Sequence, residues 1–242
     1  QRFSDWYYAI TTCRLGDEHG RGPLQRACVR FQQGILSVTT APELVDWAHG
    51  IVVDEVGMAG GRIAGGDFPS RLTNSKSPTE LLKEVARQLS ADEVRLLSAA
   101  YDTNVALEEV QQEAEAMGGY PLAVLQARLT LKRALRDKSS VAFTEVPDSP
   151  NLDLAPLPLY EAGRMGTAAE ESGFEKWMLT NMPLCKDIAE FGVFAQALRA
   201  GAFRGLAVIR KPDAAQQTET AAADGTPEEE APPSVGVALP VA

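Results

Sequence analysis

Hydrophobic side chains recur at intervals of three and four residues along most of the chain, a spacing typical of amphipathic helices. The pattern predicts a first helix that ends at Gly16 and a second that begins at Pro23. Three more helices begin directly after Thr40, Ser77 and Ser90, and a further helix begins at Leu122. The first pair spans about 3–15 and 23–35, the helix after Ser90 runs to Met117, and the helix from Leu122 runs to about Lys138. Two more helices are predicted over about 167–181 and 184–200.

Four of these helices have a recognisable start. The segments Thr40–Glu43, Ser77–Glu80, Ser90–Glu93 and Thr167–Glu170 each place a hydroxyl residue three positions before a glutamate. In this capping box the hydroxyl accepts from a backbone N–H and the glutamate reaches back to the cap. Four such starts, each followed by apolar residues at intervals of three and four, indicate a helical protein.

The pattern changes at 146–166, where prolines are frequent and no helical period is visible. Dense proline favours extended backbone. The apolar side chains there favour a strap laid on another surface over a free linker: Leu152, Leu154, Leu157, Leu159 and Tyr160. After Pro212 the chain is rich in Ala, Thr, Glu and Pro, a composition typical of disorder.

We therefore predict a mostly α protein: an irregular multi-helix array of antiparallel helix hairpins, with a Pro-rich extended strap and a disordered acidic C-terminal tail. The predicted division is an N-terminal helical domain (1–145), the strap (146–166), a C-terminal helical hairpin region (167–211) and the tail (212–242). Strap leucines Leu152, Leu154, Leu157 and Leu159, with Tyr160, Phe174 and Trp177, are the side chains we expect at a partner interface.

The segment 11–28 holds Cys13, His19 and Cys28. Their spacing lacks the close cysteine pair of zinc sites. If 16–22 is the turn of a helix hairpin, Cys13 and Cys28 lie at equal distances from its centre and can be neighbours. The pair is then either two buried thiols or a disulfide, which would stabilise the fold by roughly 3 kcal/mol.

Two other segments suggest chemistry but have simpler explanations. The glycine-rich segment 57–68 lacks the Lys-Ser/Thr ending and the glycine spacing of phosphate loops, so we interpret it as a helix end followed by a loop. His49 lies beside the apolar face of its helix, which favours a partly buried structural histidine over a general base. No catalytic, metal-binding or cofactor-binding residues are predicted.

The charge and the hydropathy of the chain limit the classes of partner that we expect. The formal net charge is −10, and six acidic residues without any Lys or Arg lie in 213–242. No basic patch for nucleic acid is visible, and no apolar run is long enough to cross a membrane. Basic runs at 25–30 and 131–138 are interpreted as solvated helix faces. The chain begins with Gln1, and we expect a leader to have been removed on entry into an organelle.

In general character the chain resembles the supernumerary subunits of large mitochondrial membrane complexes. The resemblance implies a non-catalytic accessory subunit on the matrix side or associated with the inner membrane, bound to other protein subunits and reaching the membrane only through them. Mitochondrial ATP synthase is the first expectation and a respiratory-chain complex the second. The alternatives are a soluble helical adaptor that binds protein partners and an enzyme with an unrecognised helical site.

Overall fold

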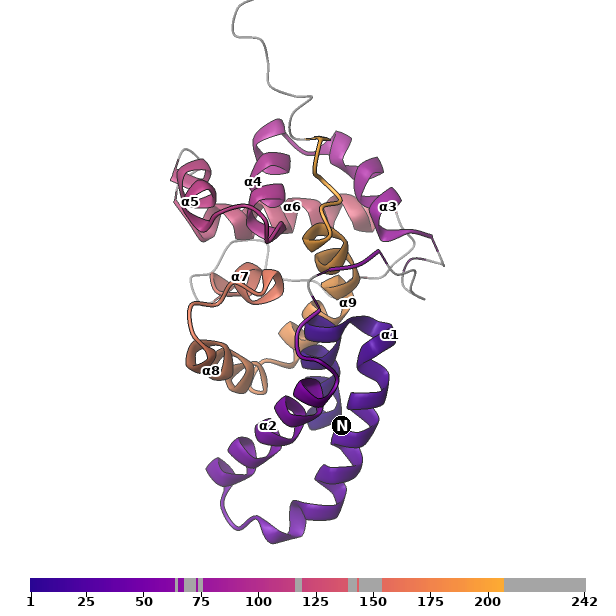
Figure 1. Cartoon of the computed structure of the whole chain (residues 1–242), viewed down its shortest axis with the longest axis vertical. Helices are drawn as coiled ribbons and strands as arrows, with labels where there is room; N and C mark the ends of the chain where they lie inside the picture. The colour runs from indigo at the N-terminus through magenta and orange to yellow at the C-terminus, as the bar shows by residue number, and fades with distance from the viewer. Residues whose placement is uncertain are drawn as a thin grey trace, which may run out of the picture. The chain divides into compact units, whose positions relative to one another are not determined.

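A computed structural model describes residues 1–63, 65–67, 73, 76–115, 119–138, 143 and 154–206. All of them belong to one compact unit, Gln1–Arg210. The described residues form α-helices and short 3₁₀ turns, and no β-strand is assigned among them, which confirms the mostly α class (Figure 1). The predicted acidic tail and Leu152 lie outside the described residues.

The helices are, in chain order, α1 (Arg2–Gly34), α2 (Ala41–Met58), α3 (Pro78–Val85), α4 (Ala91–Tyr101), α5 (Leu107–Glu115), α6 (Leu122–Lys138), α7 (Leu157–Ala162), α8 (Ala168–Met178) and α9 (Met182–Arg199). Short 3₁₀ turns follow α1 (Ile35–Ser37) and α3 (Ala86–Gln88).

All four predicted helix starts are confirmed. The side chains of Thr40, Ser77, Ser90 and Thr167 each accept from the backbone N–H three residues later. At Ser90 and Thr167 the glutamate also returns to the cap, which completes the capping box. These starts were predictable because a cap depends on four consecutive residues only.

The turn predicted between the first two helices was misplaced. The chain reverses at Gly16 alone, which has φ 83° and ψ 165°, and Pro23 lies inside the helix that follows. A Cβ built at Gly16 would lie 2.3 Å from Nε2 of Gln196, so both the positive φ and the close approach require glycine. The two arms of α1 then pack together, with the rings of Phe3 and Phe31 4.5 Å apart.

Two other predictions need correction. The helix expected to continue to Met117 ends at Tyr101, because Asp102 leaves helical geometry and its carboxylate accepts from the backbone of Asn104. The strap expected to be extended contains helix α7. Its proline, Pro158, lies in the first helical turn, where the missing N–H costs nothing, and Gly163 with φ 73° ends the helix.

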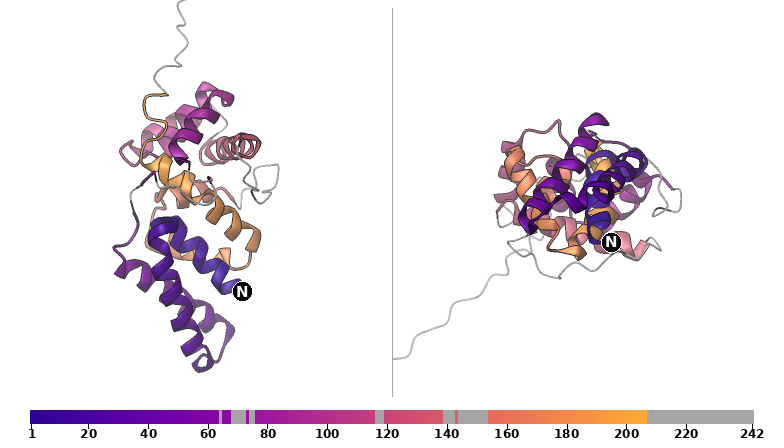
Figure 2. Two further views of the ribbon diagram at one scale, coloured as in Figure 1. Left: turned by 90° about the vertical axis from the view of Figure 1, so that its right-hand side faces the viewer. Right: turned by 90° about the horizontal axis from the view of Figure 1, so that it is seen from below.

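The buried side chains form two hydrophobic clusters. One gathers α3, α4, α5, most of α6 and the C-terminal part of α9. The other gathers α1, α2, α7, α8, two leucines of α6 and the N-terminal part of α9. Helix α9 thus contributes to both clusters and packs closely along α1 (Figure 2). Helices on both sides of the predicted strap therefore share the same cores.

Candidate functional site

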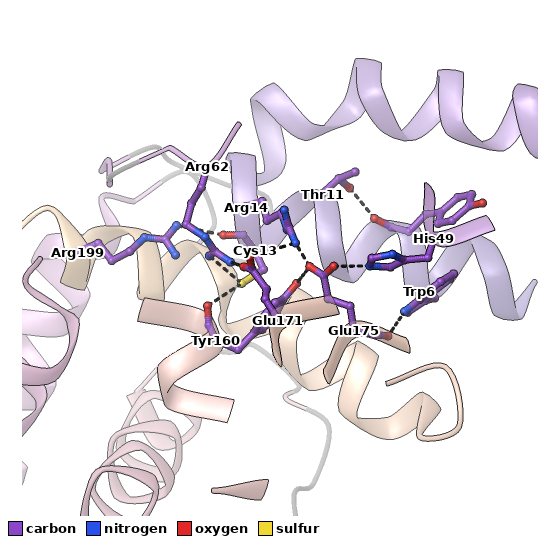
Figure 3. Close-up of polar contacts among 11 residues, drawn as sticks. Trp6, Thr11, Cys13, Arg14, His49, Arg62, Tyr160, Glu171, Glu175 and Arg199 are labelled. Carbon is purple, nitrogen blue, oxygen red and sulfur yellow. Dashed lines mark hydrogen bonds and ion pairs between the residues drawn. The ribbon is translucent and has the colours of Figure 1, made fainter. Parts of the chain in front are cut away.

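One group of polar side chains is buried between α1, α2, α7 and α8, around the carboxylate of Glu175 (Figure 3). Oε1 of Glu175 accepts from Nε of Arg14 and from the hydroxyl of Tyr160, each at 2.7 Å. Oε2 lies 2.7 Å from Nε2 of His49. The backbone oxygen of Glu175 accepts from the indole N–H of Trp6 at 2.5 Å. We call this group the Glu175 node.

The surroundings of Glu175 set its charge. Burial alone would raise the pKa of this carboxyl, but the hydrogen bonds from His49 and Arg14 outweigh burial and hold the pKa below its ordinary value. Burial raises the pKa of Tyr160, so its hydroxyl keeps its proton and donates. Glu175 is therefore a buried anion held by donors from three different helices.

A second carboxylate on α8 extends this node toward Cys13. Glu171 pairs with Arg14 at 3.4 Å and also with Arg62, whose guanidinium lies 5.3 Å from the centre of the Tyr160 ring. Nη1 of Arg62 lies 3.7 Å from Sγ of Cys13. Burial raises the pKa of the Cys13 thiol in spite of this arginine, so the thiol remains protonated and unreactive.

A separate group, which we call the Arg128 node, is buried between α4, α6, α7 and α9. Nε and Nη2 of Arg128 donate to the two oxygens of Glu161 at 2.7 and 2.6 Å, and Nη2 also donates to Asp187 at 2.7 Å. Lys132 pairs with Asp187, and the hydroxyl of Tyr101 donates to Glu161 at 2.7 Å. Two cations thus face two anions, and this set of charges is neutral.

Arg128 and its partners are shielded from water. The side chains of Arg128, Glu161 and Asp187 have no exposed area. The guanidinium of Arg128 also lies 4.3 Å from the centre of the Phe191 ring. Burial raises the pKa of Glu161, and the nearby Asp187 acts in the same direction against the pull of Arg128.

Arg199 connects the two nodes. It donates through Nη1 to the backbone oxygen of Glu161 and through Nη2 to that of Cys13, the latter at 3.1 Å. Because α7 carries both Tyr160 and Glu161, this short helix also joins the nodes directly. The polar interior is therefore continuous from α2 through α8 and α7 to α6.

The chemistry open to these groups is narrow. The His49–Glu175 pair has the form of an imidazole oriented by a carboxylate, as in hydrolase triads. Among the described residues, no hydroxyl or thiol forms a hydrogen bond with that imidazole, and Cys13 instead contacts Arg62. No group of three or more His, Cys, Asp or Glu side chains in the described part of the chain is arranged to hold a metal ion.

The predicted cysteine pair is not formed. All three cysteines are free thiols, Cys13 is buried and Cys28 is partly exposed. The reversal at Gly16, instead of over 16–22, moves the centre of the turn toward the N-terminus. Cys13 therefore contacts Arg62, while Cys28 lies close enough to Tyr7 to influence the pKa of that phenol.

Most of the predicted interface side chains are buried in the chain's own core: Leu154, Leu157, Tyr160 and Phe174. That part of the prediction was wrong, because α7 and α8 turn their apolar sides inward. Leu159 and Trp177 are partly exposed and stay predictions. His49 is more deeply buried than expected, with 7% exposure, and its imidazole lies against Glu175.

The sequence did not reveal the Arg128 node. Lys132, which we assigned to a solvated face, is only 6% exposed. Helix α6 is buried on most of its circumference, so its charged residues are buried with its leucines. The only signal was the i, i+4 spacing of Arg128 and Lys132 within an apolar helix, which alone does not name their partners.

Comparison with protein-family models, with curated proteins and with solved structures finds no match. Among the described residues, no helix is both long and apolar enough to cross a membrane.

Proposed function

We propose that this chain is a non-catalytic accessory subunit of a large organellar membrane complex, with mitochondrial ATP synthase as the first assignment and a respiratory-chain complex as the second. In this role it contributes to assembly or stability of the complex and binds other protein subunits.

The proposal rests on the observation that the buried ionisable groups are engaged in contacts between helices. In the Glu175 and Arg128 nodes, carboxylates are paired with arginine, lysine, histidine or tyrosine from other helices. Groups engaged in this way fix the relative positions of helices and have little freedom to move a proton or bind a substrate. A rigid helical body is what a structural subunit requires.

The alternative of a soluble adaptor also has an observation in its favour. Leu36, in the loop end of the α1–α2 hairpin, is 96% exposed. Figure 1 shows this end of the hairpin clear of the other described helices. An exposed leucine at the tip of a rigid element is suited to insertion into a partner's pocket.

The test is the native size of the protein in its own cells. A native gel of a detergent extract, with the chain located by mass spectrometry, should place it in a band far larger than 26.0 kDa together with a fixed set of other subunits. Migration as a free monomer or dimer contradicts the subunit proposal. A large band whose composition varies between preparations favours the adaptor.

A further inference from the structure

The outer surface of the α1–α2 hairpin is the main apolar surface left open in the described residues. Its exposed large hydrophobic side chains are Val29 at 50%, Leu36 at 96% and Met58 at 68%. We call this surface the hairpin face, and it comprises Gln25, Arg26, Val29, Arg30, Gln32, Leu36, Gly50, Asp54, Gly57 and Met58.

The two helices contribute differently shaped rows to the hairpin face. On the α1 side, Val29 lies on the helix and Leu36 lies in the 3₁₀ turn that follows it. On α2, Gly50 and Gly57 are seven residues apart, and a Cβ added at either would meet nothing within 4 Å. The α1 side therefore projects apolar side chains, and the α2 side leaves space at its two glycines.

The charges of the hairpin are separated in the same way. From 19 to 38 the chain has Arg21, Arg26 and Arg30 and no acid, whereas from 39 to 61 it has four acids and no Lys or Arg. Arg26 pairs with Glu55 and Arg30 with Asp54 inside the hairpin. The side chains of Arg26 and Asp54 nevertheless remain 53% and 63% exposed, so both can still meet a partner.

We propose that the hairpin face binds a second copy of this chain through a two-fold axis parallel to the helices. That axis lays α1 of one copy over α2 of the other, which brings the basic helix onto the acidic one. Because this axis keeps each residue at its own level along the hairpin, Arg26, which lies level with Glu55, faces the acidic stretch around the partner's Asp54. A two-fold axis across the helices would instead lay α1 on α1 and oppose arginine to arginine.

The available area makes this a weak dimer. Helix α2 has 18 residues, a length of about 27 Å, and two packed helices are about 20 Å wide. The face therefore offers about 500 Å² per copy, at the low end of specific interfaces. We expect a monomer–dimer equilibrium that depends on concentration and weakens with salt.

Sedimentation equilibrium of the full chain over about a hundredfold range of concentration tests this inference. The wild-type chain should shift from monomer toward dimer as concentration rises. The V29D/L36D double variant should reduce the association constant at least about tenfold, since both substitutions bury a carboxylate in the contact. A wild-type chain that stays monomeric over this range overturns the inference.

Further variants separate the face from general effects. Gln88→Asp, at an exposed position on another element, should leave the association constant unchanged. Asp54→Arg places like charges against the partner's α1 and should weaken association. If circular dichroism shows V29D/L36D to be unfolded, Leu36→Ser provides the same test at a position outside the α-helices. A dimer that persists in Leu36→Ser and in Asp54→Arg contradicts the proposed arrangement.

Discussion

Glu161 and Glu175 are both fully buried carboxylates, yet their pKa values are shifted in opposite directions. Glu175 takes hydrogen bonds from three side chains on three helices, so its ionised form is favoured in spite of burial. Glu161 also accepts three hydrogen bonds, two from Arg128 and one from Tyr101, but burial and the neighbouring carboxylate of Asp187 raise its pKa. The charges that surround each carboxylate therefore decide the direction of its pKa shift, since burial raises the pKa of both and each accepts three hydrogen bonds.

The two nodes should therefore respond differently to the loss of one member. In the Arg128 node every charge depends on an opposite charge that water cannot replace, so removal of one member leaves an unpaired ion in the core. The Glu175 node lies closer to solvent, since the side chains of Arg14 and Glu171 are 13% and 20% exposed. Water can compensate part of a loss there.

The largest effect is expected from Asp187→Ala. This change removes the Asp187 carboxylate from both Lys132 and Arg128, and should lower the free energy of unfolding by about 3–5 kcal/mol. Chemical denaturation measures it. The matched control is Asp137→Ala on the exposed side of α6, which should stay within about 0.5 kcal/mol of wild type. Equal effects of the two substitutions would show that water can replace the ion pairs of the Arg128 node.

Glu175→Gln should cost less, about 1–3 kcal/mol, because the amide keeps the shape and part of the hydrogen bonding. The loss should be concentrated in α8, which Glu175 ties to α1, α2 and α7. Hydrogen exchange would then quicken at α8 amides before those of α4 and α6. Glu108→Gln on α5, an exposed glutamate, is the control and should leave exchange unchanged. Uniform acceleration over all helices would argue against a local role.

Acid should destabilise the protein through Glu175. Its pKa is lower in the folded state than in the unfolded state, so its contribution is fully present above the ordinary glutamate pKa of about 4.3. It is lost as the pH falls through the lowered folded pKa. The unfolding free energy of Glu175→Gln should therefore fall less steeply below that pH than wild type. Parallel curves would mean that Glu175 does not titrate in this way.

The smallest effect is expected at the surface. Arg21 pairs with Asp17 one turn away in α1, but its side chain is 57% exposed. Water solvates both ions after either is removed. Arg21→Gln should leave the melting temperature unchanged within error, and a clear drop would show that this pair matters more than its exposure implies.

The sequence predicted what depends on neighbouring residues and missed what depends on distant ones. The caps at Ser90 and Thr167 and the ends of α6 and α9 follow from local patterns. The reversal at Gly16 was missed because Pro23 is also a normal first residue of a helix, and only Gln196, 180 positions away, shows why glycine is required. The Arg128 node joins α4, α6, α7 and α9, and no local pattern identifies such partners.

The central claim, that the interior charges are paired to hold helices together, is tested most directly by a double-mutant cycle on Arg128 and Asp187. The free energies of unfolding of Arg128→Met, Asp187→Leu and the double variant would be compared with wild type. Each single change should cost about 3–5 kcal/mol. The double should cost clearly less than their sum, because the direct Arg128–Asp187 interaction is lost in both single variants but only once in the double. Strict additivity of the two single effects would contradict the account.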